Sequence, residues 1–390
     1  MYPHQIERLT AALEREGLAA VIATSAANVF YVTDIRGFGD EIVRPERFAV
    51  WTPRGVGFVV PAADVAHVVS EGVEVDHLAA FGDAACSYAE KLTRDEERVR
   101  EAIERREPSP GAALVAALRA LGVNHGRIGL DENNFAPAAW DRLTAQLVGS
   151  TVVPGAAALL SARRVKSPYE IESLGRVLGI AEEALNAVLQ VLKPGVTERE
   201  AAAVYQSEVV KRDATPSPPS IAVGERTWIT APPPTDRALK MGDLARFDVG
   251  AVFKGYCSSV ARTAVMGEPT ERQASMLDAV QAGLGMGIDA VKPGATAGSV
   301  YDVVISAVRG AGLPGFERGH AGHAIGLEPY ERPALEAGET AVLEAGEVLC
   351  IDAAHLEIGW GGVALRDTVL VTTGGSRVLN RSVRGLIVLD

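Results

Sequence analysis

The sequence contains only three cysteines in 390 residues, namely Cys86, Cys257 and Cys350. Their number is odd and no pair has the Cys-x-x-Cys spacing, so the sequence indicates neither a disulfide framework nor a zinc knuckle. Such sparse cysteine is typical of the reducing cytoplasm. The N-terminal segment lacks the basic start and apolar stretch of a signal peptide. We therefore expect a cytoplasmic protein.

Long apolar runs and dense basic segments are also missing. No uncharged apolar run reaches the ~18 residues that suggest a membrane-spanning helix. The formal net charge is −12, and no basic block is dense enough to follow a phosphate backbone. An acidic chain is also repelled by anionic membrane surfaces. We therefore expect no nucleic acid and no membrane among its partners.

The chain has enough length and apolar content for about two domains. Hydrophobic residues make up 47% of it, which allows a sizeable core and excludes a mainly disordered protein. Residues 1–155 show alternating helices and strands, including a helix that ends at Gly17, a strand over residues 18–24 and a hairpin around residues 53–55. This alternation predicts an α/β domain with a largely parallel sheet.

A second domain is predicted over residues 160–390, beyond the Val153-Pro154-Gly155 boundary. Its first long helix is expected to begin at Ser167-Pro168, with the serine as N-cap and the proline at the first helical position. Residues 192–197 (LKPGVT) recur as residues 291–296 (VKPGAT). Each copy lies between two apolar helices, so we expect two similar α/β halves packed face to face around a cleft.

Polar side chains recur on the predicted strands of this second domain. Residues 244–266 have the pattern of two strands joined at Lys254-Gly255, and residues 347–372 have that of a second pair. Side chains alternate between the two faces along a strand. Asp248 and Ser259 can therefore face one cleft from neighbouring strands.

Three C-terminal segments carry a motif pattern: FDVG at 247–250 with RT at 262–263, GHAIG at 322–326, and CID at 350–352 with RDT at 366–368. Their order, spacing and flanking residues resemble those of the pita-bread hydrolases, which include methionine aminopeptidase, aminopeptidase P, prolidase and creatinase. The N-terminal part resembles the creatinase and prolidase N-terminal domain, with residues 26–33 as its "N-x-x-Y" strand end. The resemblance implies an α/β (α+β) protein, with a creatinase-like domain over 1–155 and a pita-bread domain over 160–390.

The resemblance also implies a metal site that this sequence has largely lost. The metallopeptidases of the family carry Asp, Asp, His, Glu and Glu at five positions, because two divalent cations need these ligands. The matching residues here are Asp248, Ser259, His323, Asp352 and Arg366. Serine supplies no carboxylate and guanidinium cannot ligate a metal, so we expect no cofactor, and Arg366 paired with Asp248 and Asp352. The alternative is one divalent ion, such as Mn or Zn, on Asp248, His323 and Asp352.

Two further histidines of the family are missing from this chain. Ala231 stands at the position of one, and Tyr330 at the position of the other. His323 is therefore the main candidate for moving a proton near neutral pH. Tyr330 can donate to a developing oxyanion or serve as a packed aromatic ring.

Two acidic residues complete the predicted site. Asp352 and Glu331 are candidate acid/base partners of the catalytic histidine, or they form ion pairs with Arg366 or Arg332. The predicted substrate-binding residues are Arg366, Tyr330, Asp248 and Ser259.

Three functions are compatible with this pattern. The favoured one is a metal-independent hydrolase of a C–N bond in a small polar metabolite, resembling creatinase, in which Arg366 anchors a substrate carboxylate and His323 moves the proton. The alternatives are an Xaa-Pro dipeptidase or aminopeptidase with a degenerate metal site, and a non-catalytic pita-bread binding protein. The expected partner is a small-molecule substrate. The resemblance further implies a homodimer in which the N-terminal domain of one subunit closes the cleft of the other.

Overall fold

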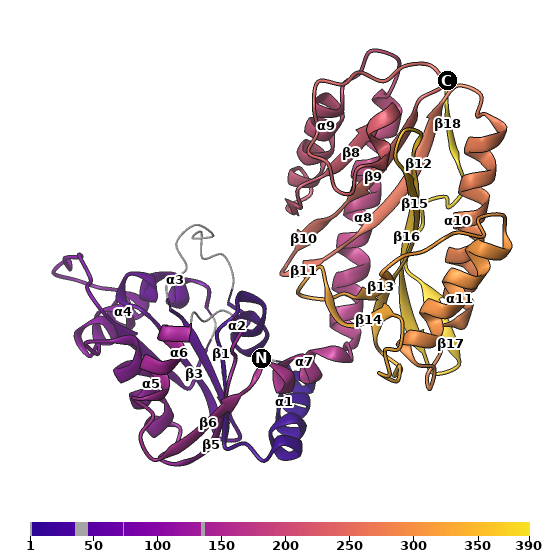
Figure 1. Ribbon diagram of the computed structural model, residues 1–390. Helices are drawn as coiled ribbons and strands as arrows, with labels where there is room; N and C mark the ends of the chain where they lie inside the picture. The colour runs from indigo at the N-terminus through magenta and orange to yellow at the C-terminus, as the bar shows by residue number, and fades with distance from the viewer. Residues whose placement is uncertain (1, 36–45, 73, 134–136) are drawn as a thin grey trace. The chain divides into compact units, whose positions relative to one another are not determined.

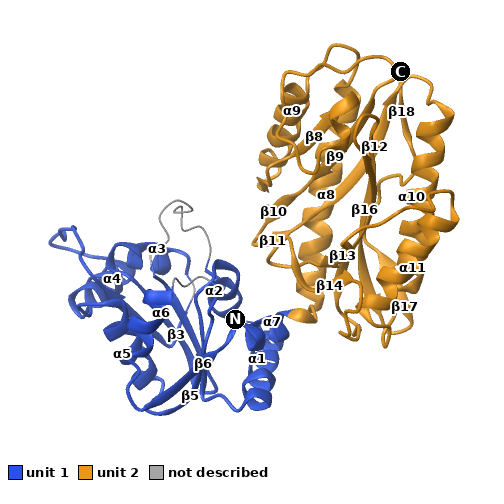
Figure 2. Cartoon of the chain, in the orientation of Figure 1, with its two compact units in different colours: residues 1–163 blue, residues 164–390 orange. Residues whose placement is uncertain are grey.

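The computed structural model describes residues 2–35, 46–72, 74–133 and 137–390. The chain divides into two compact units, residues 1–163 and residues 164–390 (Figure 2). The division falls at the end of helix α7, and the limits expected from the sequence, 155 and 160, stay predictions. Within the described ranges, no helix is both long and apolar enough to cross a membrane.

Unit 1 is built on a six-stranded sheet in the order β4-β3-β2-β1-β5-β6. The pairs β3–β4, β1–β5 and β5–β6 are parallel, whereas β1–β2 and β2–β3 are antiparallel. The predicted α/β domain is therefore confirmed. Its elements are α1 (Pro3–Glu16), β1 (Ala20–Ala23), α2 (Ala26–Thr33), β2 (Phe48–Thr52), β3 (Gly55–Pro61), the 3₁₀ turn η1 (Ala62–Asp64), α3 (Val65–Ser70), β4 (His77–Phe81), α4 (Arg94–Glu104), α5 (Pro110–Ala120), β5 (Gly126–Leu130), α6 (Pro137–Thr144), β6 (Ser150–Pro154) and α7 (Ala156–Arg164).

Residues 26–33 form helix α2, so the expected strand end at this place is wrong. The Asp131 carboxylate, just after β5, accepts hydrogen bonds from Ser25 N at 3.1 Å, from Ser25 Oγ at 2.8 Å and from Asn28 Nδ2 at 2.7 Å. A carboxylate near a helix N-terminus interacts favourably with the helix dipole. This tertiary contact overrides the strand propensity of a segment rich in β-branched and aromatic residues.

Unit 2 contains a nine-stranded sheet with the central order β14-β13-β15-β16-β12-β9-β8, to which β17 adds at β16 and β18 at β12. A small three-stranded sheet has the order β11-β10-β7. The elements are α8 (Pro168–Val191), α9 (Glu198–Val210), β7 (Thr215–Pro216), β8 (Ser220–Val223), η2 (Gly224–Trp228), β9 (Leu244–Val249), β10 (Ala251–Phe253), β11 (Tyr256–Cys257), β12 (Val260–Met266), α10 (Glu271–Ala290), α11 (Ala297–Gly310), β13 (His320–Ala324), β14 (Glu331–Glu336), β15 (Val348–Glu357), β16 (Gly361–Thr372), β17 (Gly375–Val378) and β18 (Ile387–Leu389).

The repeated motif marks two similar halves of unit 2. Thr197 caps α9 by accepting from Glu200 N, and Thr296 caps α11 by accepting from Ser299 N. Both repeats therefore join a long helix to a second helix. The sequence suggested that the two halves pack face to face, and this expectation is wrong. They meet edge to edge in one sheet, because β12 and β16 pair through their backbones.

The two faces of this sheet have different roles. Odd-numbered residues of β15 and β16, such as Ile351 and Leu365, are buried in a core with Leu284 of α10 and Val304 of α11. Figure 1 shows these two helices lying along the strands. Even-numbered residues must point to the opposite face, which we call the site face. It carries a small cluster of buried alanines, Ala261, Ala354 and Ala364.

Candidate active site

Neighbouring strands place both predicted aspartates beside Arg366. Asp352 on β15 lies directly opposite Arg366 on β16. Arg366 in turn pairs with Ala261 on β12, and Ala261 pairs with Asp248 on β9. Directly opposed residues share one face of a sheet. The short side chain of Ala261 lets the guanidinium extend across the row to Asp248.

The Arg366 guanidinium binds three of the predicted site residues. Its Nη1 donates to Asp248 Oδ1 at 2.6 Å and to Ser259 Oγ at 2.8 Å, and its Nη2 donates to Asp352 Oδ2 at 3.3 Å. The predicted pairing of Arg366 with both aspartates is confirmed. Burial disfavours the charged guanidinium, but the two carboxylates raise the pKa of Arg366 above its ordinary value. We call Asp248, Ser259, Asp352 and Arg366 the Arg366 cluster.

A second arginine, Arg318, joins this cluster and was absent from the predicted site residues. Its Nη2 donates to Asp352 Oδ2 at 2.8 Å. Burial alone would raise the pKa of Asp352, yet Arg366 and Arg318 outweigh burial and lower that pKa to about 2. Asp352 is therefore an ionised acceptor at neutral pH.

His323 lies on the same face with one ring nitrogen free. The residue is 3% exposed, and its Nδ1 is 3.0 Å from the carbonyl oxygen of Ala324. A carbonyl only accepts, so Nδ1 carries the hydrogen and Nε2 carries the lone pair. Nε2 has no hydrogen-bond partner among the described residues. Burial, the largest influence, lowers the pKa of His323 to about 4, so the ring is neutral at pH 7.

Tyr330 covers this histidine. Its ring centroid lies 3.9 Å from that of His323, with the planes tilted by 37°. Tyr330 itself is 61% exposed. The histidine is thus shielded on one side by a ring whose outer side faces solvent.

Glu331 lies next to Tyr330 but belongs to a different ion pair. Its Oε2 is 2.8 Å from Lys166 Nζ, and the two side chains are 3% and 2% exposed. Its Oε1 accepts from the backbone N–H groups of Leu327 and Glu328. The expected partner, Arg332, binds Glu336 instead. The buried pair therefore fixes the loop that carries Tyr330, and Lys166 is a further residue that sequence reasoning missed.

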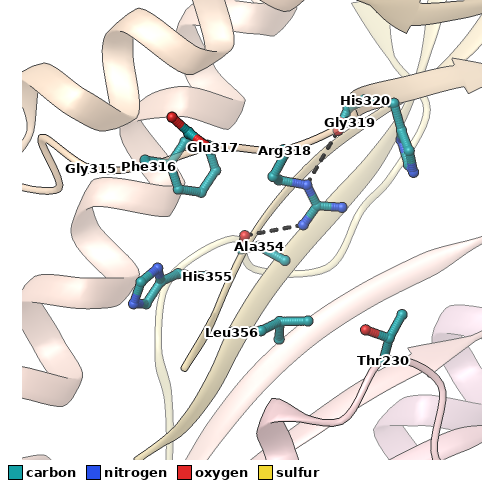
Figure 3. A pocket seen from close by; sticks show the side chains of 10 residues that line it. All are labelled: Thr230, Gly315, Phe316, Glu317, Arg318, Gly319, His320, Ala354, His355 and Leu356. Atoms are coloured by element: carbon teal, nitrogen blue, oxygen red, sulfur yellow. Dashed lines mark hydrogen bonds between the residues drawn. The ribbon is translucent and has the colours of Figure 1, made fainter. Parts of the chain in front are cut away.

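A pocket opens beside the cluster, with a volume of about 390 Å³ (Figure 3). Its lining consists of residues 315–320, Thr230 and residues 354–356. This volume is in the range of small-molecule sites, ~300–1,000 Å³. Arg318 lines the pocket and also binds Asp352, so the pocket borders the Arg366 cluster. We call it the Arg318 pocket.

Arg366→Ala is expected to lower the free energy of unfolding of unit 2 by up to about 3–5 kcal/mol, because it removes the buried guanidinium that binds both Asp248 and Asp352 and leaves Asp352 with Arg318 alone. Arg332→Ala is the matched control, since the Arg332–Glu336 pair has side chains 67% and 43% exposed. We expect the control to cost at most about 1 kcal/mol. Urea unfolding monitored by circular dichroism measures both. Equal losses in the two variants would contradict a buried, stabilising cluster.

The buried His323 predicts a pH dependence of stability. Its folded pKa of about 4 lies below the ordinary value of 6.5, so the unfolded chain binds more protons between these values. Stability should therefore rise with pH from about 4 to 6.5, by about 3 kcal/mol for this residue. His323→Asn should remove that part of the rise. An unchanged pH profile of unfolding in the variant would show that His323 titrates normally.

Known proteins resemble this chain over both units. The model described as Metallopeptidase family M24 matches residues 172–373, and the one described as Creatinase/Prolidase N-terminal domain matches residues 5–165. Peptidase YqhT of Bacillus subtilis is 28% identical over 67% of this chain and 75% of its own length. The Xaa-Pro dipeptidase of Pyrococcus furiosus is 30% identical over 58% of this chain and 65% of its own length. The solved structure of an Xaa-Pro dipeptidase from Bacillus anthracis has the same fold, with a TM-score of 0.80, 21% identity and 99% of both chains covered.

These comparisons confirm the pita-bread resemblance and correct two expectations. The favoured function, a metal-independent hydrolase resembling creatinase, is wrong, because the relatives bear the names of peptidases and Xaa-Pro dipeptidases. The alternative of a degenerate Xaa-Pro dipeptidase agrees better with them. The expectation of no cofactor is also wrong, because the matching family is one of metallopeptidases.

The side chains at the ligand positions nevertheless do not fit a pair of divalent ions. The Arg366 guanidinium lies between Asp248 and Asp352, and the Ser259 hydroxyl accepts from it. A guanidinium is a permanent cation without a free lone pair. Among the described residues, no group of three or more His, Cys, Asp and Glu side chains is arranged to hold an ion. The side chains at the five ligand positions are therefore unsuited to a centre of two metal ions.

Proposed function

Because the chain belongs to metallopeptidase family M24, whose model matches residues 172–373, we propose that the protein hydrolyses Xaa-Pro dipeptides. Water adds across the amide bond before proline, and the products are residue Xaa with a new carboxylate and free proline. The similarity to the Xaa-Pro dipeptidase of Pyrococcus furiosus supports this substrate class.

The observation that carries the proposal is the free Nε2 of His323 on the site face. His323 on β13 lies opposite Cys350 on β15, and Cys350 precedes Asp352 by two residues. His323 therefore points to the same face as the Arg366 cluster. A neutral imidazole in this place can take a proton from the attacking water and return it to the proline nitrogen as that nitrogen leaves.

Arg366 has donors left for the substrate. A guanidinium has five N–H groups, and three of them donate to Asp248, Ser259 and Asp352. Its Nε has no partner among the described residues. We assign this group and the remaining Nη2 N–H to the amide carbonyl oxygen, where negative charge develops. Tyr330 contacts the substrate from the solvent side.

Initial rates on Ala-Pro, Gly-Pro and Ala-Ala test the proposal, measured in metal-free buffer and with added Mn²⁺. Rates are also measured with added Mn²⁺ because the family is one of metallopeptidases. We expect cleavage of the two proline dipeptides and slow or no cleavage of Ala-Ala. The proposal fails if neither buffer supports cleavage before proline, or if Ala-Ala is cleaved as fast as Ala-Pro.

We also propose that the protein is a cytoplasmic homodimer, as the pita-bread resemblance implies. The mass of one chain is 41.0 kDa, so a dimer has 2 × 41.0 = 82.0 kDa. Light scattering after size exclusion measures this mass directly. A mass near that of one chain at micromolar concentration would exclude a stable dimer.

A further inference from the structure

Arg318 is held rigidly at the wall of the Arg318 pocket. Its Nε donates to the His320 carbonyl at 3.2 Å, its Nη1 to the Ala354 carbonyl at 3.1 Å and its Nη2 to Asp352 Oδ2 at 2.8 Å. Figure 3 shows the guanidinium between the first two of these acceptors. The side chain keeps 19% exposure. A guanidinium fixed in this way needs little reordering when it binds a ligand.

Two N–H groups of Arg318 make no hydrogen bond to any residue that the structure describes. A guanidinium has five N–H groups, and the contacts to His320, Ala354 and Asp352 use three of them. The remaining two are the second hydrogens of Nη1 and Nη2. Glu317, the acidic residue of the lining, forms no ion pair with Arg318 among the described residues. In the described ranges of the chain, neither of these two N–H groups donates to a protein acceptor.

The site face also carries an excess of positive charge. Arg246 stands two residues before Asp248 on β9, so it shares the face of the Arg366 cluster. Its Nη2 donates to the Ile229 carbonyl, next to the pocket. Three arginines (Arg246, Arg318 and Arg366) stand against two aspartates (Asp248 and Asp352), and in the part of the chain described here the ion pairs of these arginines go to those aspartates alone.

Glu317 is the acidic residue of the pocket lining, and its exposed carboxylate forms no ion pair with Arg246, Arg318 or Arg366 among the described residues. On the site face the three guanidinium groups therefore outnumber the two aspartates by one, and a bound monoanion would balance that charge.

From these contacts we propose that Arg318 binds a carboxylate of the substrate in the Arg318 pocket and so determines which substrates are accepted. This inference rests on the proposed function, because it names a group of the same substrate. A carboxylate offers two oxygens to the two free N–H groups, and charge-assisted pairs of this kind are the strong ones. The carboxylate comes either from the proline terminus or from an acidic Xaa side chain.

Three probes distinguish these sources by calorimetric titration of the full-length protein. N-acetyl-L-proline carries only the terminal carboxylate, N-acetyl-L-prolinamide carries none, and L-aspartyl-L-prolinamide carries only the side-chain carboxylate. We expect one of the two acidic probes to bind about 10–100-fold more tightly than N-acetyl-L-prolinamide. The acidic probe that does so identifies the source.

Variants of Arg318 test whether this residue is responsible. Arg318→Gln should reduce the preference for the acidic probe to less than about 3-fold, and Arg318→Lys, which keeps the charge, should retain part of it. Arg309→Gln is the matched control: Arg309 donates to the Phe316 carbonyl of the same segment but does not line the pocket. The control should keep the full preference. If Arg318→Gln does not fold, Arg318→Lys and the wild-type probe comparison still decide.

Equal affinities of wild-type protein for all three probes would overturn the inference, and so would a preference that survives in Arg318→Gln. Either result leaves the proposed function intact if Ala-Pro is still cleaved. Conversely, an Arg318-dependent carboxylate preference without any cleavage of Ala-Pro would overturn the proposed function, and with it the assignment of the carboxylate to a substrate.

Discussion

Replacing Ser259 with Asp and Arg366 with Glu in one variant is expected to raise the affinity for Mn²⁺ by at least about 100-fold, which equals about 2.7 kcal/mol. The double change removes the guanidinium from between Asp248 and Asp352 and adds two carboxylates. Carboxylates and neutral imidazole are suitable ligands for such an ion, and His323 Nε2 has no competing partner among the described residues. Calorimetric titration of wild-type and variant protein measures the difference.

The single variant Ser259→Asp is the matched control. It adds one carboxylate but keeps Arg366, whose Nη1 already donates to Ser259 and would pair with the new carboxylate. We therefore expect its Mn²⁺ affinity to change by less than about 10-fold, or 1.4 kcal/mol. Wild-type protein that binds two Mn²⁺ ions as tightly as the double variant would contradict this account, because it would show that the guanidinium leaves the cluster readily.

His323→Ala is expected to lower kcat on Xaa-Pro dipeptides by about 10²–10⁴-fold, the usual contribution of a general acid or base. The wild-type protein should also keep its activity well below pH 6.5, because a base must be neutral and the pKa of His323 is about 4. The acidic limb of the pH–rate profile should therefore fall near pH 4. Initial rates from pH 3.5 to 8 measure both effects.

His125→Ala provides the control for this variant, since His125 is an exposed residue of unit 1. Its kcat should match that of the wild type. A His323→Ala protein that is folded and retains wild-type kcat would exclude proton transfer by His323. An acidic limb near pH 6.5 would show that the histidine is more accessible to water than the structure indicates.

The Arg366 cluster was predicted from the pita-bread resemblance, and strand periodicity agrees with it. Asp352 and Arg366 lie at even positions of two long strands, and even positions share one face. The resemblance placed Asp248, Asp352 and Arg366 at the ligand positions of one site, and opposite charge then predicted that Arg366 contacts both aspartates. The caps were predictable for a similar reason, because Ser167 followed by Pro168 is a local signal for a helix start.

Arg318 and Lys166 were not predictable from local pattern, because their roles depend on tertiary register. Arg318 precedes β13, and the pairing of β13 with β15 brings it to the Ala354 carbonyl and to Asp352. The register of β13 and β15 could have revealed Arg318. Arg318 precedes His323 by five residues, and continuing the antiparallel His323–Cys350 register by that number leads to the part of β15 near Ala354. For Lys166 no such count is possible, since its partner Glu331 is 165 residues away in the chain.

Two errors came from features that composition and motifs do not reveal. The halves of unit 2 join through the backbones of β12 and β16. Backbone pairing between the edge strands of two halves cannot be recognised from the pattern of side chains. The metal-independent hydrolase was favoured because Ser259 and Arg366 replace metal ligands, and too much weight was placed on these two replacements. Both the creatinases and the dipeptidases belong to the pita-bread hydrolases, so the fold could not separate them, and the relatedness to peptidases decided the question.

The most direct test of the proposed reaction is hydrolysis of Ala-Pro in water enriched in ¹⁸O, with products identified by mass spectrometry. The reaction is run in metal-free buffer and with added Mn²⁺, and the His323→Ala variant serves as the control. We expect free proline without label and alanine with one ¹⁸O in its new carboxylate, formed by the wild type at least about 100-fold faster than by the variant. Intact Ala-Pro after prolonged incubation in both buffers would contradict this expectation.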